Sequence, residues 1–124
     1  DAIAHPFFVM ALQTGGDPQM KLPFMLQILN EMRPKRLDWM LDRLAEDHIA
    51  LEISPRLTYL PVFQEFMAGL YRKARTKDIR FLLGSDSHRL ITVGQYDKLL
   101  GFVQSIGIGP EDLWHPEMSR NRKT

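Results

Sequence analysis

The stretch IRFLLGSDSH, residues 79–88, is the most informative part of the chain for both fold and chemistry. Its first half is a short apolar run that predicts a buried strand, and Asp86 and His88 follow that run two residues apart. In an extended chain, residues i and i+2 point to the same side, so a carboxylate and an imidazole can face one point. Oxygen and nitrogen donors arranged in this way favour a divalent metal site.

The residues around this pair bear on the metal interpretation. Gly84 permits either an unusual backbone angle or a close approach of another group. Ser85 and Ser87 can orient neighbouring groups by hydrogen bonds. An Asp-x-His pair taken by itself is also compatible with a simple surface hydrogen bond, so the spacing alone leaves both interpretations open.

The rest of the chain alternates short apolar runs with amphipathic segments. We expect strands over residues 2–4, 49–53 and 79–83, and helices over 20–32, 35–46, 59–73, 95–105 and, as one short turn, 110–114. Strands that alternate with helices imply parallel pairing through right-handed crossovers. The predicted fold class is therefore α/β, with parallel strands alternating with helices.

Candidate polar residues fall within or just after each of these strands. His5 follows the first strand, Glu52 is the charged residue in the second, and Asp86 and His88 follow the third. The carboxyl ends of parallel strands share one face of a β/α barrel, and that face carries the chemistry. His5 before a proline can instead be structural, and Glu52 can instead belong to a salt bridge.

Four segments of the chain together resemble a known family. Residues 4–6 read AHP, residues 50–54 read ALEIS, residues 83–89 read LGSDSHR, and Val-Gly follows at 93–94. In order and rough spacing they resemble the later half of a PHP domain (polymerase and histidinol phosphatase), over about residues 1–114. The resemblance implies the later part of a distorted (β/α)7 barrel.

The resemblance also implies a set of site residues. His5, Asp86 and His88 match metal ligands of the family, and Glu52 matches a glutamate near the site. The implied activity is a metal-dependent phosphoesterase with two or three divalent ions, Zn, Mn or Fe. Asp86 would also be catalytic by accepting a proton from the attacking water. Arg89 could bind a substrate phosphate, as arginine suits bidentate phosphate recognition, or merely pair with an acid. The implied substrate is a small phosphorylated compound or a nucleotide.

The chain departs from the family pattern at its start. The His-x-His motif that opens a PHP domain is not present, and the sequence begins with Asp1 inside a predicted strand. We therefore expect residues 1–117 to be the C-terminal portion of a barrel whose N-terminal part lies elsewhere, with a basic tail at 118–124. This piece alone is expected to be inactive. The alternative is a non-catalytic PHP remnant or an assembly domain of a larger protein. The partners considered are the N-terminal part of the same barrel and further copies of the chain in a homo-oligomer.

Composition limits the remaining possibilities. A net charge of +1 gives no electrostatic case for nucleic acid or an anionic membrane. The absence of cysteine excludes disulfides and thiolate ligands and fits a cytoplasmic protein. No apolar run approaches the roughly 20 residues that span a bilayer. His48 and His115 belong to no motif and are expected to be structural.

Overall fold

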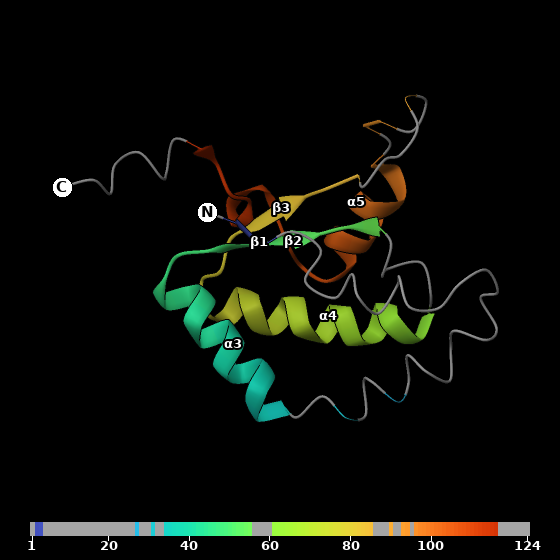
Figure 1. Cartoon of the computed structure of the whole chain (residues 1–124). Coiled ribbons are helices and arrows are strands. Elements are labelled where there is room, and N and C mark those ends of the chain that lie inside the picture. Colours follow the sequence, from blue (N-terminus) through green and yellow to red (C-terminus); the bar gives the residue numbers. More distant parts are fainter. Residues whose placement is uncertain are drawn as a thin grey trace.

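The structure, a computed structural model, describes residues 2–3, 27, 31, 34–55, 61–85, 90, 93–94 and 96–116. Its elements follow in the order β1 (Ala2–Ile3), α3 (Pro34–Glu46), β2 (Ala50–Ile53), α4 (Pro61–Thr76), β3 (Phe81–Leu83), α5 (Asp97–Ser105) and the 3-10 helix η3 (Pro110–Asp112) (Figure 1). This order confirms the predicted alternation of strands and helices. The predicted helix at 20–32 lies outside the described residues except for Gln27 and Glu31, which are helical.

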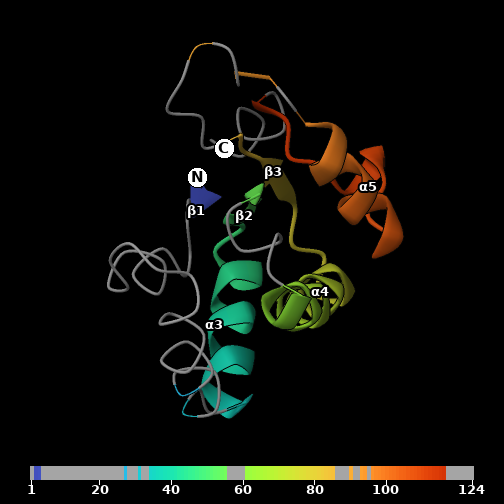
Figure 2. The same ribbon diagram turned by 90° about the vertical axis from the view of Figure 1, so that its right-hand side faces the viewer.

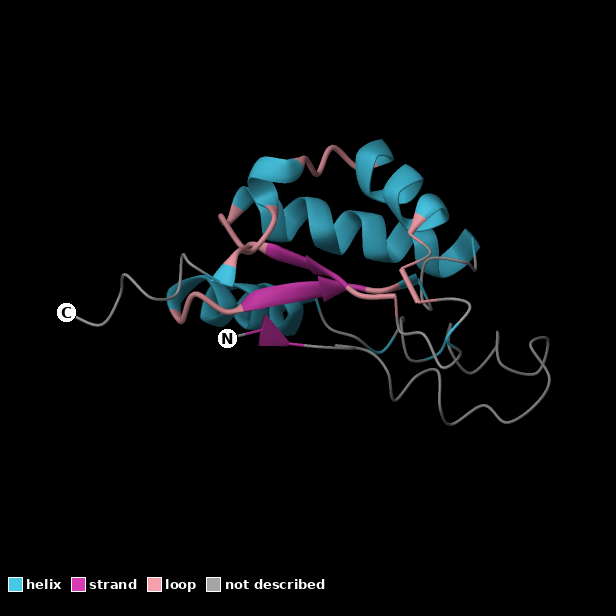
Figure 3. Ribbon diagram, turned by 90° about the horizontal axis from the view of Figure 1, so that it is seen from above, coloured by secondary structure: helices cyan, strands magenta, loops and turns pink. Residues whose placement is uncertain are grey.

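The three strands form one parallel sheet in the order β1-β2-β3. Ala2 pairs with Ala50 in the first ladder, and Leu51 pairs with Phe81 in the second. Seen from above, β2 and β3 run side by side in the same direction (Figure 3). Parallel neighbours need a crossover connection, and α4 provides it between β2 and β3. The parallel α/β arrangement is confirmed, whereas closing a barrel takes more strands than the described residues contain.

The described helices all lie on one side of the sheet (Figure 2). Leu51, Ile53 and Phe81 contribute the strand side of the core and are each 0% exposed. The helices complete the same cluster with Leu41, Leu44, Met67, Leu70, Tyr71, Ala74, Leu99, Phe102 and Val103. Burying a side chain of this size contributes about 1.5–3 kcal/mol relative to leaving it exposed, so this layer holds the helices against the sheet.

Three helices end in the same way, with one residue in the left-handed region. His48, Asp78 and Gly107 have φ values of 54°, 58° and 81° and follow α3, α4 and α5. In each case the next amide N–H reaches back five residues, as in the 2.9 Å bond from Ile49 to Leu44 O. This is the Schellman arrangement, which satisfies the last carbonyls of a helix. At His48 and Asp78 this arrangement reverses the chain, so that α3 is followed closely by β2 and α4 by β3.

The chain after α5 adds to the free edge of β3. The predicted short turn at 110–114 is confirmed as η3, and Leu113 then forms a parallel bridge with Phe81. The Trp114 N–H donates to Phe81 O at 2.8 Å. Arg75 of α4 reinforces this end through a 2.9 Å ion pair from Nε to Asp112 Oδ2. The C-terminal part of the described chain therefore covers the edge of β3 rather than extending away from it.

Two ion pairs link α3 with α4 and with the residue that follows α4. Lys73 pairs with Asp38, and Lys77 pairs with Asp42. Pairs of this partly exposed kind contribute about 0–1 kcal/mol each, so they orient the two helices more than they stabilise the core. Among the helices in the described part of the chain, none is both long and apolar enough to cross a membrane.

Candidate functional site

The three strands direct the chain toward one edge of the sheet. All pairings are parallel and β2 lies between β1 and β3, so the carboxyl ends of the strands share that edge. The segments that follow β1 and β3 contain His5, Asp86, His88 and Arg89. These four residues lie outside the described residues, so their convergence stays a prediction. Glu52 of β2 is the predicted site residue that the structure does place.

Glu52 lies on the face of the sheet that is turned away from the described helices. Side chains alternate along a strand, and Leu51 and Ile53 on either side of Glu52 both belong to the buried cluster under the helices. Glu52 is half-buried on the opposite face. In a β/α barrel the face opposite the helices is the barrel interior, so this orientation fits the predicted position of Glu52 near a site.

The side chain of Glu52 lies over Gly84, the first residue after β3. A Cβ atom at position 84 would overlap Glu52 Oε1 and would lie 2.8 Å from Cδ and 3.3 Å from Cγ. Of the two sequence-based explanations for Gly84, a close approach is therefore correct. Gly94 and Gly107 are the described glycines with positive φ, and Gly84 is not among them. The carboxylate of β2 thus occupies the place where a side chain after β3 would stand.

Tyr71 of α4 fixes the backbone of Glu52 from the other face of the sheet. Its hydroxyl donates to Glu52 O at 3.2 Å, and the residue is 1% exposed. The ring makes edge contacts with Phe81 and Phe102 at centroid distances of 5.9 and 6.4 Å. Burial, and secondarily the charge of Glu52, raise the pKa of the Tyr71 hydroxyl well above its usual value.

Sequence reasoning missed the role of Tyr71. Its spacing of four residues after Met67 was the available signal, because residues i and i+4 share a helix face and Met67 is 1% exposed. The pattern could place Tyr71 in the core, but no local pattern indicates that its hydroxyl reaches a strand carbonyl nineteen positions earlier.

The two histidines expected to be structural are both exposed. His48 is the left-handed residue that ends α3, which is a backbone role and supports the prediction made for it. His115 follows the bridge formed by Leu113 on the outer edge of β3. His48 precedes β2 and His115 lies beyond β3, so neither residue is a neighbour of Glu52 in the sheet.

The donor types predicted for the carboxyl edge are a carboxylate and two imidazoles. The Glu52 carboxylate fills the space above Gly84, and the chain passes from Gly84 toward Asp86 and His88. Carboxylate and imidazole groups suit Zn, Mn and Fe without selecting one of them. Within the residues that the structure describes, His, Cys, Asp and Glu form no group of three or more that could hold a metal. The predicted ligands themselves fall outside that search.

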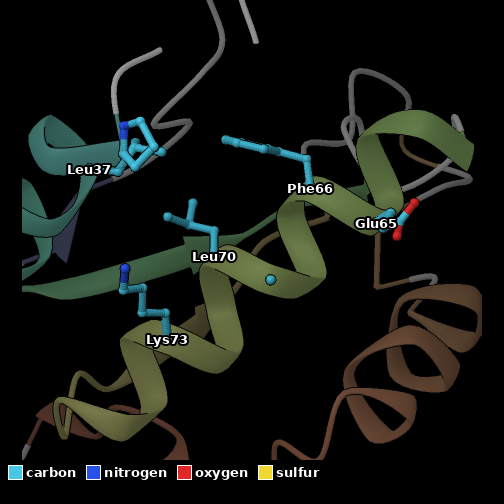
Figure 4. A pocket seen from close by; sticks show the side chains of 7 residues that line it. Leu37, Glu65, Phe66, Leu70 and Lys73 are labelled. Atoms are coloured by element: carbon cyan, nitrogen blue, oxygen red, sulfur yellow. The ribbon is translucent and has the colours of Figure 1, made fainter. Parts of the chain in front are cut away.

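A cavity of about 530 Å³ lies elsewhere, between α3 and α4 (Figure 4). Its wall is formed by Pro34, Leu37, Glu65, Phe66, Gly69, Leu70 and Lys73. Most of these side chains are apolar, and Lys73 is engaged by Asp38. The cavity belongs to the helix layer, whereas Glu52 points to the opposite face, so we do not assign the predicted chemistry to it.

Comparisons of the chain with protein-family models, with curated proteins and with solved structures give no match.

Proposed function

We propose that this chain is the later part of a PHP-type (β/α)7 barrel and that the complete barrel is a metal-dependent phosphoesterase. The observation that carries the proposal is the Glu52 carboxylate lying over Gly84, at the shared carboxyl edge of parallel strands. The motif Gly84–His88 begins at that contact. A charged group close to the carboxyl end of a strand, on the face away from the helices, supports a site at the catalytic end of a barrel, because an apolar core would disfavour it.

In this proposal His5, Asp86 and His88 hold two or three divalent ions together with ligands outside this sequence. Bound ions of this kind supply Lewis acidity toward phosphoryl oxygens and lower the pKa of a coordinated water. Asp86 also accepts the proton of the attacking water. Arg89 supplies a planar pair of donors for phosphate, which matches the geometry of phosphate oxygens.

The substrate class we propose is a small phosphomonoester or a nucleotide. The net charge of +1 gives no electrostatic case for a long polyanion, so recognition is expected to depend on local groups such as Arg89. The lack of cysteine leaves nitrogen and oxygen ligands only, and it agrees with a cytoplasmic location.

The test is Asp86→Asn in the longer protein that carries the complete barrel. Asn keeps the shape but removes the charge that offsets the metal ions, and we expect turnover of p-nitrophenyl phosphate to fall about 100-fold or more, since even outer ligand changes cost about 10–100-fold. His48→Gly is the control, because His48 is exposed and left-handed, and glycine satisfies that conformation. Equal losses in the two variants, or near-normal turnover of Asp86→Asn with unchanged metal content, would contradict the proposal.

A second candidate, an assembly domain without catalysis, is favoured by one observation. Leu90 and Val93 are 94% and 63% exposed, and the Val93 N–H donates to Leu90 O at 3.2 Å, so both belong to one turn. Apolar side chains exposed together can serve as a contact surface. Light scattering of the wild type and of Leu90→Ser/Val93→Ser tests this candidate: it predicts an oligomer that the substitutions dissociate.

A further inference from the structure

We propose that Glu52 is a positioning residue, whose carboxylate fixes the direction in which the chain leaves β3 toward Asp86 and His88. This inference rests on the proposed function, because it assigns Glu52 a task for the predicted ligand pair. Glu52 would act through the backbone at Gly84 rather than by binding a metal ion itself.

The contact at Gly84 is specific to Glu52. The three heavy atoms nearest to a Cβ at position 84 are Oε1, Cδ and Cγ of that one side chain. The Gly84 N–H also donates to the O atom of Ile53, the last residue of β2, at 3.1 Å, so the pairing of the two strands continues one residue past the end of β3. The chain at Gly84 is thus held by a backbone hydrogen bond within the ladder and by a side chain against its face.

Glu52 is itself supported by the core. Its carbonyl oxygen accepts the Tyr71 hydroxyl at 3.2 Å, and Leu51 and Ile53 beside it are 0% exposed. A side chain anchored on such a rigid strand defines the position of its neighbour more closely than a side chain on a loop. Asp86 follows Gly84 by two residues, so a shift at Gly84 is passed on to the predicted ligands over a very short length of chain.

Gly84→Ala is a clean perturbation of this contact. The φ of Gly84 is not in the left-handed region, so alanine adds no backbone strain of that kind. The added methyl group has to displace the Glu52 carboxylate. Gly101→Ala is the matched control, because Gly101 is exposed in α5 and has nothing within 4 Å of an added Cβ.

The experiment is a Zn²⁺ titration of the longer protein that carries the complete barrel, in competition with a chromogenic chelator, with thermal unfolding to verify that each variant is folded. We expect Gly84→Ala and Glu52→Ala each to weaken Zn²⁺ binding about 10–100-fold, the range for residues that orient ligands. Gly101→Ala should bind like the wild type. The double variant Glu52→Ala/Gly84→Ala should be no weaker than Glu52→Ala alone, because the methyl group then meets no carboxylate.

Glu52→Gln separates positioning from direct coordination. Gln retains the length of the side chain, so a positioning role predicts that Glu52→Gln binds Zn²⁺ with an affinity close to that of the wild type. A loss of Zn²⁺ affinity equal to that of Glu52→Ala would overturn the inference. If Gly84→Ala is folded and binds Zn²⁺ as tightly as the wild type, the positioning role of Glu52 is overturned. The proposed function would not be affected by that result. A wild-type complete barrel that binds neither Zn²⁺ nor Mn²⁺ would instead overturn the proposed metal site and the inference with it.

Discussion

Tyr71→Phe isolates the hydrogen bond that anchors Glu52. The variant keeps the aromatic ring, and with it the edge contacts with Phe81 and Phe102, and removes only the hydroxyl that donates to Glu52 O at 3.2 Å. One such bond contributes about 0.5–1.5 kcal/mol to the free energy of unfolding. We expect Tyr71→Phe to lose about 1 kcal/mol at pH 7, which corresponds to a fall in Tm of about 3–6 °C for a chain of this size.

The same residue predicts a pH dependence with a defined sign. Folding raises the pKa of the Tyr71 hydroxyl, so at alkaline pH the unfolded chain releases this proton before the folded chain does. Its stabilising effect is therefore complete below pH of about 10, the usual tyrosine value, and decreases above it. Since phenylalanine carries no such proton, the advantage of the wild type should shrink by up to about 1.4 kcal/mol for each pH unit above that value.

Urea unfolding of both proteins at pH 7, 9 and 11 measures this difference. The free-energy gap between wild type and Tyr71→Phe should be equal at pH 7 and 9 and should vanish or reverse at pH 11. A gap that stays constant through pH 11 would show that the hydroxyl is not held protonated by its surroundings. A gap of zero at pH 7 would show that the bond to Glu52 O contributes nothing.

Three further predictions follow from the fold and the proposed site. His48→Gly should raise the free energy of unfolding in urea by about 0.5–1 kcal/mol, because it relieves a Cβ at φ 54°. Leu41→Ala should lower the same quantity by about 2–5 kcal/mol, because this side chain is 0% exposed. The 124-residue chain alone should hydrolyse p-nitrophenyl phosphate poorly even with added Mn²⁺, and robust turnover that a chelator abolishes would contradict the expected lack of ligands.

The elements of the fold could be predicted because local patterns specify them. Apolar runs at 49–53 and 79–83 became β2 and β3, and the apolar stripe of the segment 35–46 became α3, with Leu41 and Leu44 buried. Boundaries were less certain: α4 extends to Thr76, past the predicted end at residue 73. Side-chain periodicity fades at a helix end, whereas the actual stop depends on Asp78 adopting a left-handed conformation.

The contacts of the candidate site could be predicted only in part. Glycine at position 84 indicated either a turn or a close approach, and only the packing of β2 beside β3 identifies Glu52 as the approaching group. The bond from Tyr71 to Glu52 joins two elements through tertiary packing, for which the sequence has no local signal. The assignments of His5, Asp86, His88 and Arg89 depend on motif and resemblance, and they stay predictions.

Anomalous diffraction from crystals of this chain grown with Mn²⁺ or Zn²⁺ is the most direct test of the proposed metal site. We expect an anomalous peak at the carboxyl edge of β1 and β3, with His5, Asp86 and His88 at coordination distances of about 2.0–2.2 Å for zinc. Glu52 should lie over Gly84 beside that site without contacting the ion. A peak elsewhere on the molecule, or His5 and Asp86 on opposite sides of the sheet, would contradict the account.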